Sequence, residues 1–315
     1  MITNLAASVF HLGTELLSFG LVFPRVSKLR ILNPVASTTS LMRFILTFSK
    51  TSDLEIQHPR WTRGDRDKNS SPLPCGRDNI VFDGSLVLVG LGGKFEEFTS
   101  LLAKQGMRFK IIRLLRCGFS CSSAMRDFSD AIRDTVAFLN VAPLWRGECV
   151  DKIGSDSYLL VRAEQKWIPM EIPECESLKV LVLDMKGGVR VEEAANWINS
   201  ITSTRLAVFV LDFGDRDIMF VRKAGPGSLL DKALCGLARR VNEETGGRLT
   251  MALAAKNPCE LVAMLPEFRK VGNIWQGETV IGNTSGRRDH YWSFLAATES
   301  ERQEADESVL DYLRV

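Results

Sequence analysis

The sequence predicts an α/β fold, a leucine-rich-repeat solenoid with a curved parallel sheet on the concave face and helices on the convex face. Two observations predict this fold. The chain matches itself at offsets of 25 and 28 residues, and apolar residues with helical spacing lie between the matched strands. A period of about 20–29 residues is typical of leucine-rich repeats, in which each unit buries its apolar side against its neighbour.

The strands are predicted by the pattern apolar-x-x-apolar-x-apolar, in which alternate side chains of a short strand point to the same face. In the first self-match Leu16 to Pro34 aligns with Leu41 to Pro59, and in the second Leu178 to Asp184 aligns with Leu206 to Asp212. The pattern occurs in four clear copies and one weaker copy, which are Val26, Leu29, Ile31; Phe109, Ile112, Leu114; Leu178, Leu181, Leu183; Leu206, Phe209, Leu211; and, more weakly, Thr51, Leu54, Ile56.

Helices are predicted between the strands, where apolar residues lie at positions i, i+3, i+4 and i+7. This spacing begins at Leu41, Ala194, Leu230 and Leu261. The last of these helices has a start signal, Asn257 as N-cap followed by Pro258, and Pro266 within it should kink or shorten it. The apolar residues from Phe128 to Leu139 also suggest a helix.

The predicted solenoid covers residues 1–297, and the remaining residues 298–315 form an acidic C-terminal cap or tail. Two irregular loops interrupt the repeats, near residues 62–79 and 214–228. Glycine and proline mark both loops, and the first is also rich in charged residues.

The composition predicts a globular protein without a membrane or nucleic-acid partner. Of 315 residues, 45% are hydrophobic and 25% charged, and 40 basic residues against 38 acidic ones leave a net charge of +2. The first 24 residues carry only the charge of Glu15, and the uncharged run Met1 to Thr14 is too short to span a bilayer. We therefore expect a cytoplasmic or nuclear protein, and we expect its seven cysteines to be free thiols.

The turn from Gly90 to Lys94 is a candidate phosphate site, because an apolar strand enters a Gly-x-Gly-Gly turn and a helix follows from Phe95. The dinucleotide fingerprint would require glycine at Phe95, and the Walker spacing would require glycine at Leu88. A plain strand-to-helix turn is therefore favoured, and a nucleotide-binding α/β enzyme is the alternative.

Catalytic and metal-binding groups are not predicted. Cys117 and Cys121 lie far in sequence from the three histidines, so no zinc ligand set has a recognisable spacing. Asp184 and Asp212 end matching strands, and their equivalence in the repeat explains them without acid–base chemistry. The sequence therefore predicts no catalytic residue, no metal and no cofactor.

The helix-to-strand segment Ser40 to Trp61 resembles the leucine-rich repeats of basidiomycete F-box-like proteins. The stretches Trp197 to Phe209 and Leu229 to Leu234 are similar to those repeats as well. The resemblance implies a substrate-binding repeat region. It also implies an N-terminal F-box that docks on a cullin-ligase adaptor. Met1 to Glu15 is shorter than an F-box, so a cullin-ligase adaptor is not among the expected partners.

On the predicted sheet, the side chains between the buried positions face outward. They are Arg30, Glu55, Gln57, Arg113, Asp184 and Asp212. Their mixed charges favour an unidentified protein or peptide partner over a polyanion. The sequence therefore predicts a non-enzymatic protein-interaction scaffold. The alternatives are the nucleotide-binding enzyme and a truncated or divergent copy that has kept no partner.

Overall fold

The computed structural model describes residues 4–8, 22–48, 50–62, 81–117, 128, 130–143, 175–185, 191–214, 228–255, 262–284 and 287–295. The chain divides into two compact units. Unit 1 consists of Met1–Val136 with Ala142–Ile168, and unit 2 consists of Ala137–Val141 with Pro169–Val315.

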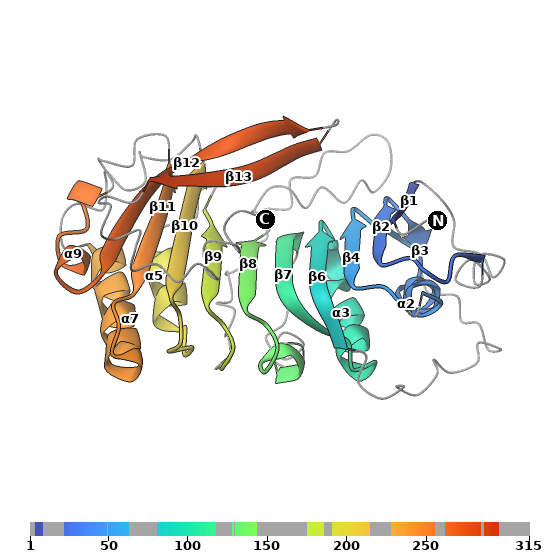
Figure 1. Cartoon of the computed structure of the whole chain (residues 1–315), viewed down its shortest axis with the longest axis horizontal. Helices are drawn as coiled ribbons and strands as arrows, with labels where there is room; N and C mark the ends of the chain where they lie inside the picture. The colour runs from blue at the N-terminus through green and yellow to red at the C-terminus, as the bar shows by residue number, and fades with distance from the viewer. Residues whose placement is uncertain are drawn as a thin grey trace, which may run out of the picture. The chain divides into compact units, whose positions relative to one another are not determined.

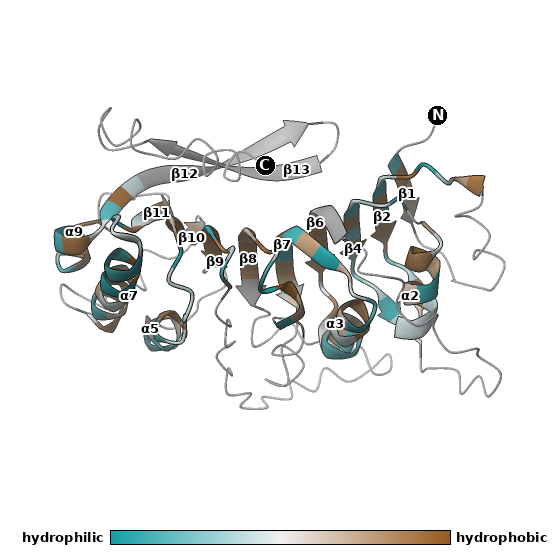
Figure 2. Cartoon of the chain, turned by 60° about the horizontal axis from the view of Figure 1, so that its bottom comes forward, coloured by the Kyte–Doolittle hydropathy of each residue, from teal (hydrophilic) through white to brown (hydrophobic). Residues whose placement is uncertain are grey.

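Unit 1 is built on a parallel sheet (Figure 1). Its described strands are, in spatial order, β1 (Asn4–Ser8), β2 (Lys28–Leu32), β4 (Asp53–Gln57), β6 (Val81–Val89) and β7 (Arg108–Cys117). Helices α2 (Thr38–Leu46) and α3 (Phe95–Lys104) lie on one side of this sheet, and the 3-10 turn η2 (Gly92–Lys94) leads into α3 (Figure 2). The short strands β3 (Val35–Ala36) and β5 (Arg60–Trp61) pair in a second, two-stranded sheet.

The registers of the strands reproduce the offsets of the sequence matches. Leu29 on β2 pairs with Leu54 on β4, 25 residues further along the chain. The residue that follows each of these strands has a positive φ angle, 48° at Asn33 and 46° at His58, and Gly90 after β6 has 64°. The repeat therefore extends from the strand into its turn, and the last two positions of each of the five predicted strand patterns lie on a strand.

Helices α2 and α3 begin where local signals place them. The Ser37 side chain accepts a hydrogen bond from the Ser40 backbone N–H at 3.1 Å and so caps α2. The buried side chains of α2 include Leu41 and Phe44, which confirms the helix predicted there. The predicted start of α3 at Phe95 is also confirmed.

Unit 2 also has a mainly parallel sheet (Figure 1). Its described strands are, in spatial order, β8 (Phe138–Pro143), β9 (Val180–Asp184), β10 (Val208–Gly214), β11 (Thr250–Ala255), β12 (Asn273–Thr284) and β13 (Arg287–Leu295). The last pair, β12 with β13, is antiparallel. The elements described as helices in unit 2 include α5 (Val191–Asn199), α7 (Leu229–Thr245) and the short α9 (Phe268–Val271). Helices α5 and α7 confirm the predictions that begin at Ala194 and Leu230.

The carboxylate of Asp231, in the first turn of α7, fixes the start of α9. This side chain is fully buried, and its two oxygens accept hydrogen bonds from the backbone N–H groups of Glu267 at 3.1 Å and Phe268 at 2.9 Å. At the other end of α7, the Asn242 amide donates to the Val271 carbonyl at 2.7 Å and accepts from the Leu249 N–H at 2.8 Å. Each of these polar side chains thus forms hydrogen bonds with backbone groups that have no partner within their own helix or strand.

One predicted helix is interrupted where the sequence predicts a break, and another is wrong over part of its length. The helix expected from Leu261 to Phe268 is interrupted, because Pro266 has no N–H to donate and its ring clashes with the preceding turn. Only α9 follows this break, and the proposed start signal at Asn257 and Pro258 lies outside the described residues. The segment from Phe128 leaves the helical conformation after Ile132, and Leu139 belongs to β8, where pairing with β9 overrides the helical spacing.

The prediction of an α/β fold with parallel strands is confirmed, and the leucine-rich-repeat solenoid stays a prediction. The predicted loops lie outside the described residues except for their ends, Thr62, Gly214 and Ser228, and the acidic tail 298–315 lies outside them as well.

Candidate protein-binding face

The sheet of unit 1 has a buried face and a partly exposed one. Along β2 and β4, residues alternate strictly between buried and accessible. Buried positions such as Leu29, Ile31 and Leu54 are at most 1% exposed. The accessible positions form what we call the partly exposed face, which consists of Lys28, Arg30, Leu32, Asp53, Glu55, Gln57, Ser85, Val87, Val89, Ile111, Arg113 and Leu115.

A row of charged side chains crosses the middle of this face. The registers place Arg30 beside Glu55, Glu55 beside Val87, and Val87 beside Arg113. Arg30 Nε lies 2.9 Å from Glu55 Oε1, an ion pair whose side chains are 25% and 23% exposed. The two atoms are not aligned for a hydrogen bond, and Arg30 Nε is buried without one. The same Oε1 atom accepts a hydrogen bond from the Gln57 amide.

Arg113 is a partly buried cation of the row. Burial lowers the pKa of its guanidinium below the ordinary value, and the charge of Glu55 partly offsets this shift. Arginine nevertheless stays protonated in proteins, so Arg113 carries a positive charge on the partly exposed face. A charge in such surroundings attracts an anion more strongly than a fully hydrated charge does.

Asp53, at the rim of the face, stabilises the position of the neighbouring strand β6. Its Oδ1 accepts hydrogen bonds from the backbone N–H and the hydroxyl of Ser85, both at 2.9 Å. These bonds hold β6 where its register with β7 shifts between Phe82 and Ser85. Gly84 lies within this irregularity, where a Cβ atom would stand 2.3 Å from the Ser52 carbonyl oxygen.

Four of the six residues predicted to face outward, Arg30, Glu55, Gln57 and Arg113, therefore lie together on unit 1. The other two lie on unit 2, where Asp184 pairs in register with Asp212. Asp212 differs from the expectation because it is buried, with 1% of its surface exposed. Whether any of these residues contacts a partner stays a prediction.

Sequence reasoning missed the aliphatic part of the partly exposed face. Val87, Val89, Ile111 and Leu115 are partly exposed. They lie at the same alternating positions as the charged residues of β2 and β4. The alternation of the strands predicts these positions on the same face. A search for charged and polar side chains alone does not include valine, isoleucine and leucine.

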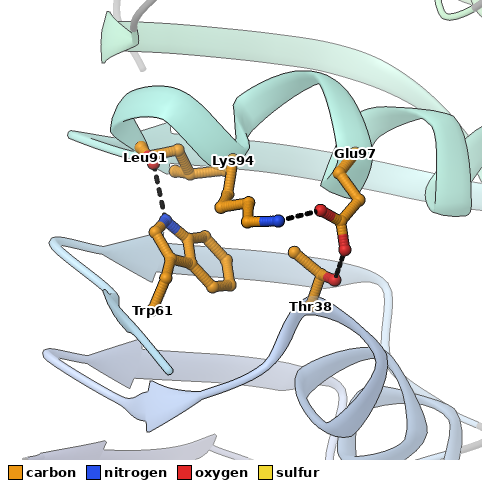
Figure 3. Close-up of polar contacts among 5 residues, drawn as sticks. All are labelled: Thr38, Trp61, Leu91, Lys94 and Glu97. Atoms are coloured by element: carbon orange, nitrogen blue, oxygen red, sulfur yellow. Dashed lines mark hydrogen bonds and ion pairs between the residues drawn. The ribbon is translucent and has the colours of Figure 1, made fainter. Parts of the chain in front are cut away.

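Neighbouring side chains make polar contacts at the turn from Gly90 to Lys94 (Figure 3). The Trp61 indole N–H donates to the Leu91 carbonyl at 2.7 Å, and the Glu97 carboxylate contacts both Lys94 and Thr38. Burial alone would raise the pKa of Glu97, but the hydrogen bonds from Lys94 and Thr38 outweigh it and lower that pKa.

This arrangement does not favour a phosphate at the turn. Glu96 and Glu97 already stand in the first turn of α3, where the helix dipole attracts negative charge, and they would repel a further anion. The nucleotide-binding enzyme stays an untested alternative that this geometry does not support.

The cysteines and acidic side chains of the described residues form no metal centre. No group of three or more histidine, cysteine, aspartate or glutamate side chains there could hold a metal ion. Cys117, Cys175 and Cys235 are buried free thiols. Burial raises the pKa of Cys117 to about 12, although hydrogen bonding with backbone groups at Leu91 and Gly90 opposes the shift.

Comparison with known proteins gives no relative. The chain matches no protein-family model, no curated protein and no solved structure. Among the described residues, no helix has both the length and the apolar character needed to cross a membrane.

Proposed function

We propose that the chain is a non-enzymatic protein-interaction scaffold, comparable with the substrate-binding repeats of fungal F-box proteins, and that the partly exposed face of unit 1 holds its partner. One observation carries the proposal. Parallel sheets are nearly always covered on both faces, yet in unit 1 the face opposite α2 and α3 keeps accessible side chains on four neighbouring strands.

The composition of the face supports a protein partner. Valine, leucine and isoleucine side chains stand beside two arginines, and arginine is enriched at protein interfaces. The aliphatic residues supply apolar area, and the charged row restricts which partner fits.

Site-specific photocrosslinking tests the proposal. A photoreactive amino acid replaces Val89 on the partly exposed face, and in a matched chain it replaces Lys104, an exposed residue at the end of α3. In cells that express the chain, we expect a discrete crosslinked protein from position 89 alone, lost when Arg113→Glu is added. Equal crosslinking from both positions, or none from position 89, would contradict the proposal.

A further inference from the structure

We draw no further inference here: the strongest candidate, the aliphatic patch formed by Val87, Val89, Ile111 and Leu115 on the partly exposed face of unit 1, belongs to the site already described, and nothing in the structure shows what covers it.

Discussion

Unit 1 and unit 2 each contain a parallel sheet whose register follows an internal repeat. They differ in whether one face or both faces of their strands are buried. In unit 1, β2 and β4 alternate between buried and accessible residues. In unit 2, the first four residues of β9 are all buried, and so are Val208 to Phe213 of β10. A parallel strand with a continuous apolar run is covered on both faces, whereas an alternating strand leaves one face for another task. The comparison locates the candidate binding face in unit 1.

The largest expected effect concerns the difference in burial between a valine of unit 2 and a valine of unit 1. Val210 on β10 is fully buried, and Val87 on β6 is partly exposed. Val210→Asn should lower the free energy of unfolding by about 4 kcal/mol, because it loses apolar burial and places an amide where water is excluded. Val87→Asn should lower it by about 0.5 kcal/mol. Urea denaturation followed by tryptophan fluorescence measures both, and equal losses would remove the distinction between the units.

The second effect concerns a carboxylate that unit 2 keeps in its interior. Asp231→Ala leaves the N–H groups of Glu267 and Phe268 without their acceptors and should lower the free energy of unfolding by about 3 kcal/mol. Asp231→Asn retains one acceptor oxygen and should lose less. Hydrogen exchange at the Glu267 and Phe268 amides should accelerate in the alanine variant. Unchanged exchange would mean that this carboxylate does not fix α9.

The third effect compares two residues of β7 that differ in burial. Arg113 is on the partly exposed face, while the thiol of Cys117 is buried and has its pKa raised to about 12 from 9.0. Because the folded state favours the neutral thiol, its stabilising contribution is complete below pH 9 and is lost as the pH rises towards 12. Between pH 8 and pH 10 the loss should be about 1 kcal/mol.

Denaturation curves at both pH values measure this loss, with Cys117→Ala as the control. The difference in stability between the native chain and this variant should shrink as the pH rises. A difference that does not change with pH would show that the thiol titrates alike in the folded and unfolded states.

The smallest effect is the contribution of the charged row on the partly exposed face to the stability of the fold. Glu55→Gln removes the ion pair with Arg30, whose partners are about a quarter exposed, and should change the free energy of unfolding by about 0.5 kcal/mol or less. A loss of several kcal/mol in stability would mean that the row serves folding and not recognition.

The sequence was sufficient for the parts of the fold that depend on local periodicity and internal repetition. The offset of 25 residues became the register of β2 with β4, and the offset of 28 became that of β9 with β10. It failed where tertiary contacts decide, because the pairing of Leu139 with Leu181 places it in a strand despite its helical spacing.

For the candidate site, the sequence placed Arg30, Glu55 and Arg113 correctly between buried positions. It misplaced Asp212, which the alternating pattern put on the outward side together with Asp184, although the apolar run before Asp212 predicts burial on both faces. The grouping of Val87 and Leu115 around Arg113 depends on strand order and register, which a linear pattern does not contain.

The accessibility of matched cysteines tests the central claim most directly. Val87→Cys and Val210→Cys are labelled with iodoacetamide in the native chain, and the rates are followed peptide by peptide by mass spectrometry. The account predicts fast labelling at position 87 and slow labelling at position 210. Equally slow labelling at both positions would contradict the account.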